Sequence, residues 1–196
     1  MKEKIIKSLK AIESSFSQGE LAYLALTSKI ERPIQDRFAF QLYKANKNNY
    51  IISREWRKTD VAILDDNSSP LALIELKAMY TFDAITEGRL DQYREKLKKD
   101  VIKAKKLANQ SSEIYTILLA THPNGIIDNK YDTFIKWSSH INRAIELNLN
   151  AETVKSIAIN NVNNLFSKWN CVSKGEISGG NAFNIETDVL YWIFKN

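Results

Sequence analysis

The chain has very few of the residues that build disulfides or metal sites with nitrogen and sulfur ligands. Its 196 residues include one cysteine, Cys171, and two histidines, His122 and His140. A single cysteine cannot form an internal disulfide, and one thiolate cannot supply the cage of a structural zinc site. Two histidines leave little room for a histidine metal site. A disulfide framework and a thiolate zinc site are therefore excluded.

Long apolar runs and glycine-rich loops are also missing. No segment approaches the roughly 18 to 20 consecutive apolar residues that span a bilayer. The N-terminal segment MKEKIIKSLKAIESS lacks the apolar core of a signal peptide. We therefore expect no membrane association and a cytoplasmic location. With six glycines and no glycine-rich phosphate loop, the sequence gives little support for a nucleotide-binding fold, so we expect no nucleotide cofactor.

Nothing in the composition divides the chain into parts. It contains no linker rich in proline or glycine and no internal repeat, and a hydrophobic content of 44% over 196 residues suffices for one buried core. We predict a single domain that comprises residues 1–196. The net charge of +5 permits a nucleic-acid partner without requiring one.

An apolar segment with two charges in it is the most informative part of the sequence. Residues 71–76, LALIEL, are rich in branched side chains and predict a buried strand. Side chains alternate across a strand, so Glu75 and Lys77 share one face while Ile74 and Leu76 point the other way. Buried ionised groups are costly unless they are paired or bind a metal. The two charges therefore point to function more than to packing.

A second predicted strand precedes this one, and a short loop joins the two. Residues 59–64, TDVAIL, predict a strand that begins near Asp60, and the turn formers DDNSSP connect it to LALIEL as a hairpin. In an antiparallel hairpin Asp60 can lie beside Glu75, and two adjacent carboxylates repel each other. A divalent cation with oxygen ligands is the usual remedy.

Asp60, followed after fourteen residues by Glu75, Leu76 and Lys77, resembles the PD-(D/E)xK motif of restriction-endonuclease-like nucleases. Thr59 stands where the motif has proline, a change that leaves the acidic residue in place. The resemblance covers about residues 30–122. It implies a PD-(D/E)xK nuclease domain with the fold of that superfamily.

The resemblance implies a metal-dependent endonuclease that hydrolyses phosphodiester bonds in DNA. In such an enzyme Asp60, Glu75 and Lys77 are catalytic, and Asp60, Glu75 and the backbone carbonyl of Leu76 hold Mg²⁺, which Mn²⁺ can replace. A small domain of this kind points to a restriction or phage-defence enzyme, and such enzymes usually cut DNA as homodimers. Two alternatives stay open, namely a catalytically inactive nucleic-acid-binding or assembly module of the same fold and an RNA-directed nuclease.

A helix before the predicted sheet supplies a further acidic candidate. The spacing of apolar residues predicts a helix over 33–46, with Pro33 in its first turn and Glu31 just before it. Many members of the superfamily carry an additional acidic residue on the helix that precedes the sheet, so the resemblance makes Glu31 a candidate metal ligand. A favourable interaction with the positive end of the helix is the other explanation for Glu31.

A basic stripe runs along the long helix predicted over 86–109. It contains Lys96, Lys99, Lys103 and Lys106. These side chains lie along one side of the helix, which favours contacts with the phosphates of DNA. Arg57 and Lys58, which flank Asp60, are further candidates for nucleic-acid binding. A solvated surface is the alternative for both groups, because lysine is a good helix former and charge keeps a surface soluble.

The remaining segments complete an α/β pattern. They predict helices over 2–16, 19–29 and 131–147, a helix capped by Asn150, a first strand over 49–57, and a strand over 113–121 that lies parallel to that of Glu75 through a βαβ crossover. Gly179 and Gly180 divide the C-terminal segment into two strands of a hairpin. The fold class is therefore α/β with a restriction-endonuclease-like core, a central mixed β-sheet flanked by helices, a helical N-terminus and a C-terminal β-hairpin.

Overall fold

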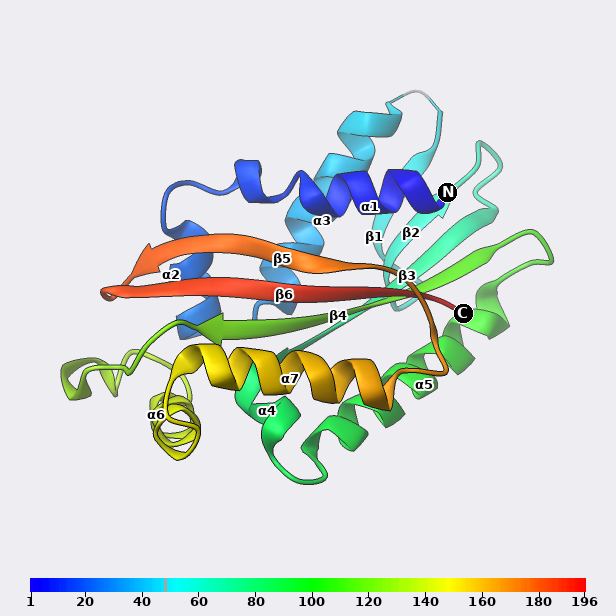
Figure 1. Ribbon diagram of the computed structural model, residues 1–196. Helices are drawn as coiled ribbons and strands as arrows, with labels where there is room; N and C mark the ends of the chain where they lie inside the picture. Colours follow the sequence, from blue (N-terminus) through cyan, green and yellow to red (C-terminus); the bar gives the residue numbers. More distant parts are fainter. Residues whose placement is uncertain (48) are drawn as a thin grey trace.

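A six-stranded mixed β-sheet forms the centre of the protein in a computed structural model, which describes residues 1–47 and 49–196 (Figure 1). The strands are β1 (Ile51–Trp56), β2 (Thr59–Leu64), β3 (Pro70–Tyr80), β4 (Glu113–Pro123), β5 (Asn170–Ala182) and β6 (Ile185–Lys195). They lie in the order β1-β2-β3-β4-β6-β5. The neighbours β3 and β4 are parallel, and the other neighbouring pairs are antiparallel.

Helices cover both faces of this sheet (Figure 1). One face carries α1 (Lys2–Lys10), α2 (Glu20–Thr27) and α3 (Glu31–Asn46), and the other carries α4 (Thr81–Ile85), α5 (Arg89–Leu107) and α7 (Ala151–Leu165). The helix α6 (Ser138–Leu147) packs against α4 and α7, and two short 3-10 helices are η1 (Glu13–Ser15) and η2 (Asn129–Tyr131). The predicted α/β class, mixed sheet, helical N-terminus and C-terminal hairpin are confirmed. Within the described residues, no helix has both the length and the apolar composition needed to cross a bilayer.

The side chains of β3 alternate between two cores. Ile74 and Leu76 are buried with α1, α2 and α3, whereas Leu73 packs in a cluster on the opposite face with residues of α5. Burying one such aliphatic side chain contributes about 1.5–3 kcal/mol, so the strand is held firmly on both sides. By the same alternation, Glu75 and Lys77 belong to the face that α5 covers.

The predicted crossover of β3, α5 and β4 is present. Glu75 of β3 lies opposite Thr116 of the parallel strand β4, and Lys77 lies opposite Leu118. The helix between them begins after Gly88, whose φ of 70° is accessible to glycine at little cost. This crossover places one long helix directly over the strand that carries the two charged residues.

Two predicted helices are shorter than expected. The helix expected over 2–16 ends at Lys10, and η1 follows as a separate turn. The helix expected over 131–147 begins only at Ser138, because Trp137 has φ 65° and ψ 22°. A residue in this left-handed conformation cannot continue a right-handed helix.

The C-terminal hairpin turns at Phe183 and Asn184, so the prediction that Gly179 and Gly180 divide its strands is wrong. Both glycines lie inside β5, at a shift of its register against β6. Phe183 and Asn184 have φ values of 56° and 62°, as a two-residue hairpin turn requires. A Cβ atom on Gly179 would lie 2.5 Å from the carbonyl oxygen of Thr187. Glycine is therefore needed there for close packing and not for the turn.

The strand β4 continues through His122 and Pro123, two residues beyond the strand expected over 113–121. His122 is buried, and its Nδ1 lies 3.0 Å from Oγ1 of Thr81. Burial and the positive charge of Lys155 lower the pKa of His122, and these outweigh the opposite effect of Asp188. His122 is thus a neutral residue of the interior.

Candidate active site

The strands β2 and β3 separate next to Asp60. The strand β2 begins at Thr59, whereas β3 continues as far as Tyr80. Val61 lies opposite Ile74 in the antiparallel register, so the next pair along brings Asp60 and Glu75 together. The two carboxyl groups are close enough that the charge of Asp60 raises the pKa of Glu75. The adjacency that the hairpin predicts is therefore present.

The carboxyl group of Asp60 also binds the backbone of β3. The N–H of Leu76 donates to Oδ2 of Asp60 at 2.7 Å. On the other side, the side-chain amide of Gln35 in α3 donates to the backbone carbonyl of Asp60 at 2.6 Å and to Oε1 of Glu55 at 2.8 Å. These contacts fix the position of Asp60 at the point where the strands part.

Glu75 lies in an environment that disfavours its charge. Only 4% of its surface is exposed. Burial, followed by the nearby charges of Asp60 and Asp100, raises the pKa of Glu75 to about 8. Burial likewise raises the pKa of Asp60. Two carboxyl groups this close cannot both ionise without a compensating positive charge, which makes the pair a place where a cation is stabilised.

Lys77 supplies a positive charge beside the acidic pair. Its Nζ donates to the carbonyl oxygen of Leu76 at 2.8 Å and lies 3.0 Å from Oδ2 of Asp100 and 3.8 Å from Oε1 of Glu31. Burial alone would lower the pKa of Lys77, but the carboxylates of Glu31 and Asp100 outweigh burial and raise it. Lys77 is therefore held as an ammonium ion and is poorly suited to accept a proton.

Glu31 joins the site from α3. The helix begins at this residue, slightly earlier than the range expected from the sequence. The N–H of Ala78 donates to Oε2 of Glu31 at 2.9 Å, at a point on β3 beyond its pairing with β2. Burial raises the pKa of Glu31, and the charge of Lys77 opposes this effect. Glu31 thus contacts both the strand and its lysine.

Two further residues belong to this network. Asp100, with Lys103, matches the acidic-then-basic pattern that often marks the helix after this strand in the nucleases that the sequence resembles, whereas Gln35 was not a candidate from the sequence. Asp100 of α5 is buried and bridges Lys77 to Lys103, whose Nζ lies 3.1 Å from Oδ1 of Asp100. Gln35 of α3 is also buried and reaches Asp60. Their signal in the sequence is weak but present, because an acidic and an amide residue occupy otherwise inward-facing positions of amphipathic helices.

An open cleft of about 360 Å³ lies beside this network, and Glu75 and Asp100 are buried behind its wall. Its walls comprise Lys29, Glu31, Arg32, Gln35, Glu55, Asp60, Lys77, Ala78, Tyr93 and Lys96. Asp60 and Glu55 come from the strands and Glu31 from α3, whereas Lys29 and Lys96 add positive charge; Arg32 also lines the cleft but is paired with Glu55 at 3.0 Å. This distribution suits an anionic ligand that approaches the acidic pair across a basic rim.

The oxygen donors of the cleft fit a small divalent cation. In residues 1–47 and 49–196, no group of three or more histidine, cysteine, aspartate or glutamate side chains is arranged to hold a metal ion. Mg²⁺, however, is usually bound through one or two carboxylates, with water and substrate phosphates completing its shell. Asp60 and Glu75, together with the carbonyl of Leu76, meet that requirement. Burial raises the pKa of both groups, and a bound cation would oppose this shift because it favours the ionised forms.

Not all basic candidates lie at the cleft. Lys96 lines it, with its Nζ 4.8 Å above the ring of Tyr93. Lys99, Lys103 and Lys106 are exposed farther along α5. Arg57 and Lys58 form the two-residue turn between β1 and β2, at φ values of 50° and 70°, and neither lines the cleft. The structure therefore brings one of the six basic candidates to the acidic pair.

Comparisons with known proteins add no identification, since no family model, curated protein or solved structure matches this chain.

Proposed function

We propose that this chain is a metal-dependent endonuclease that hydrolyses phosphodiester bonds in DNA and belongs to the PD-(D/E)xK nucleases, as a restriction or phage-defence enzyme. The observation that carries the proposal is the convergence of Asp60, Glu75 and Lys77 where β2 and β3 part, with Asp60 and Lys77 in the wall of the cleft and Glu75 buried directly behind Asp60. A chain that needed only a stable core would not place three ionisable groups there, since their desolvation is costly.

In this proposal Asp60, Glu75 and the Leu76 carbonyl hold Mg²⁺ or Mn²⁺. The metal, when bound, activates water for attack on phosphorus and balances the charge of the phosphate. The raised pKa of Glu75 means that the apo site keeps a proton which metal binding displaces. Metal affinity is therefore expected to rise with pH.

Lys77 has an electrostatic role in the same reaction. Glu31 and Asp100 hold it as an ammonium ion within 2.8 Å of the Leu76 carbonyl oxygen. From this position it stabilises the negative charge that develops on the phosphoryl oxygens in the transition state. Its raised pKa argues against a role as the base that deprotonates water.

The rim of the cleft orients the substrate. Lys29 and Lys96, which line the cleft, are positioned to contact phosphates on either side of the reacting one. Cutting both strands of a duplex takes two such clefts, so the proposal includes a homodimer. A binding module without catalysis is the second candidate, and the observation that favours it is the Leu76 carbonyl, which is already occupied by Nζ of Lys77.

Cleavage assays with site variants test the proposal. The substrates are supercoiled DNA, single-stranded DNA and RNA, each with Mg²⁺, Mn²⁺ or EDTA. We expect cleavage of DNA with either metal, none with EDTA, and a loss of roughly a hundred-fold or more in Asp60→Ala, Glu75→Ala and Lys77→Ala. Asp66→Ala, an exposed residue of the β2–β3 loop, is the matched control and should cleave normally.

Each outcome assigns a function. Near-normal cleavage by any of the three site variants contradicts the assignment of the cleft. Binding of DNA without cleavage in either metal favours the binding module, and preferential cleavage of RNA favours the RNA-directed nuclease.

A further inference from the structure

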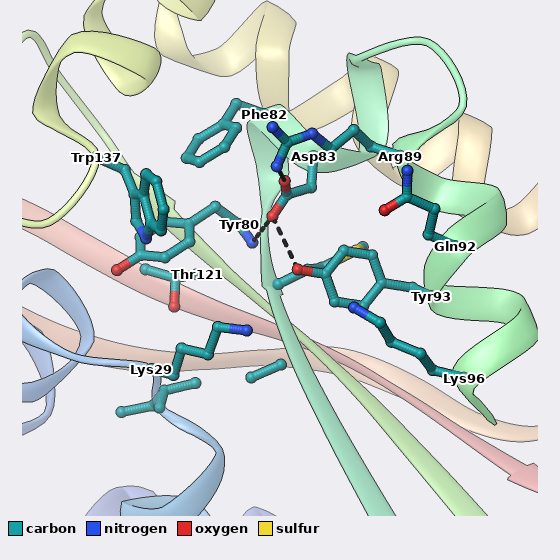
Figure 2. Close-up of a pocket in the computed structure, with 13 residues that line it drawn as sticks. Lys29, Tyr80, Phe82, Asp83, Arg89, Gln92, Tyr93, Lys96, Thr121 and Trp137 are labelled. Carbon is teal, nitrogen blue, oxygen red and sulfur yellow. Dashed lines mark hydrogen bonds and ion pairs between the residues drawn. The ribbon is translucent and has the colours of Figure 1, made fainter. Parts of the chain in front are cut away.

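A second cavity of about 210 Å³ opens beside the cleft, at the end of β3. It shares Lys29, Ala78, Tyr93 and Lys96 with the cleft, so the two are continuous along one wall. Figure 2 shows that Trp137 and Tyr93 lie on opposite sides of this second cavity, with Lys29 below and Arg89 above. A substrate strand that passes through the cleft would therefore present its next nucleotide to this cavity.

Aromatic rings form much of the cavity wall. Tyr80 and Phe82 stack on each other with ring centroids 5.2 Å apart, and Tyr93 and Trp137 complete the set. The ring of Trp137 packs edge-on against His140 at 5.6 Å, yet 46% of Trp137 is exposed. An aromatic face that is left open beside a phosphate-binding cleft can stack on a nucleobase, since every base has a π-face.

The backbone of Trp137 is strained. Its φ of 65° is uncommon for a bulky residue and is energetically unfavourable. Glycine or asparagine would adopt this positive φ more easily than tryptophan. Burial in the core does not explain the tryptophan, because almost half of its surface is exposed. Strain of this kind collects at functional sites, where a side chain must be held in place.

The charges around the cavity favour a phosphate. Lys29, Arg89 and Lys96 line it, and Asp83 is its one carboxylate among the lining residues. Asp83 is already engaged, since it accepts hydrogen bonds from the N–H of Tyr80 at 3.0 Å, from the hydroxyl of Tyr93 at 3.3 Å and from Arg89 at 3.3 Å (Figure 2). The lysines on either side are therefore available for an anion.

We propose that this second cavity binds one unpaired nucleotide of the substrate strand, with its base against Trp137 and its phosphate at Lys29 and Lys96. The inference rests on the proposed nuclease function and names a feature of its substrate, namely a nucleotide unstacked from its neighbours next to the reacting phosphate. The cavity of about 210 Å³ is smaller than the pockets of about 300–1,000 Å³ that enclose a whole ligand, so the base occupies it while the phosphate lies at Lys29 and Lys96 on the wall shared with the cleft. Gln92 in the wall offers an amide that can hydrogen-bond to a base edge.

Binding of single-stranded oligonucleotides tests this assignment without any cleavage. Fluorescence anisotropy is measured in EDTA or Ca²⁺ for the wild type, Trp137→Gly and Trp137→Phe, with Phe134→Ala as the control because Phe134 is 62% exposed on the same segment. We expect Trp137→Gly to bind about ten-fold more weakly, as one lost base stack predicts. Trp137→Phe should recover most of the affinity, and Phe134→Ala should match the wild type.

A scan with abasic sites identifies the bound nucleotide. A single abasic position is moved along the oligonucleotide. At one position the affinity of the wild type should fall to that of Trp137→Gly. The affinity of Trp137→Gly should not change at that position. A free mononucleotide is titrated in parallel. If Trp137→Gly weakens binding of the mononucleotide but leaves the affinity for oligonucleotides unchanged, the cavity binds free nucleotides. The assignment to the substrate strand is then overturned.

The outcomes separate the two proposals. Equal affinity of wild type and Trp137→Gly for every oligonucleotide overturns the nucleotide cavity and leaves the nuclease proposal intact. Failure of the wild type to bind any oligonucleotide overturns both. Trp137→Gly should keep its fold, because glycine accepts the positive φ, and a thermal melt verifies this.

Discussion

Replacing Glu75 by glutamine should stabilise the metal-free protein. The substitution keeps the size of the side chain and removes the group that burial and Asp60 disfavour as an ion. The pKa of Glu75 is raised from 4.5 to about 8. A raised pKa means that the folded state holds a proton which the unfolded state releases above pH 4.5. Stability is therefore lost as the pH rises through this window, and the loss is complete above about pH 8.

The raised pKa of Glu75 sets an upper limit on the stability gained by this substitution. At pH 7 the unfolded chain has released the proton of Glu75 and the folded chain mostly has not, which costs about 3 kcal/mol at most. The coupled carboxyl group of Asp60 reduces this figure, since it can take up part of the charge. For a chain of this size the gain of Glu75→Gln corresponds to a melting temperature that is up to about 10 °C higher.

Urea unfolding in EDTA across a series of pH values measures the effect. The difference in free energy of unfolding between Glu75→Gln and wild type should be small near pH 4.5 and should grow as the pH rises to 8. Glu87→Gln, an exposed substitution, is the control and should follow the wild type. A difference that does not change with pH would refute the reasoning about Glu75.

Divalent metal should reverse the order of stability. A cation that binds only the folded wild type at about 100 times its Kd adds roughly 2.7 kcal/mol. Glu75→Gln lacks a ligand and should gain little from Mg²⁺ or Mn²⁺, and Asp60→Asn should behave in the same way. Equal stabilisation of the wild type and both variants by metal would show that these carboxylates do not form the site.

Two further predictions concern other parts of the molecule. Replacing Lys99 and Lys106 by glutamine should reduce the slope of log K for DNA binding against log salt concentration by about 1.8, whereas Lys168→Gln should leave the slope unchanged. An unaltered slope in the double variant would mean that these lysines are solvated and do not contact phosphates. The pKa of buried His122 is lowered to about 4, so wild-type stability should fall as the pH drops from about 6.5 to 4, by about 3 kcal/mol. His122→Gln should lack this fall, and an equal fall in the variant would assign it to other groups.

The elements around the acidic pair were predictable because they depend on local pattern. The turn formers between β2 and β3 and the alternation in β3 determine the hairpin and the face of Glu75 and Lys77. The parallel pairing of β3 and β4 follows from the length of the connecting helix, which only a crossover accommodates. These local signals were sufficient to place the charged groups of the sheet.

Contacts between separate elements were not predictable. Asp100 and Gln35 reach the site from α5 and α3, and nothing in the spacing of either helix reveals which strand residue it faces. Gly179 shows the same limit, because its sequence context resembles that of a turn glycine. The close approach of Thr187 decides its role, and that approach exists only in the folded chain.

The unequal lengths of β2 and β3 account for both cavities. Beyond the pair of Asp60 and Glu75, β3 has no partner on that side, so the N–H groups of Leu76 and Ala78 are available to carboxylates from β2 and α3. Buried N–H groups require an acceptor, and here the acceptors are acidic. The same unpaired stretch of β3 continues to Tyr80 and forms the wall that the cleft shares with the aromatic cavity. Because β2 begins only at Thr59, this stretch of β3 stays unpaired on that side, and both cavities open beside it.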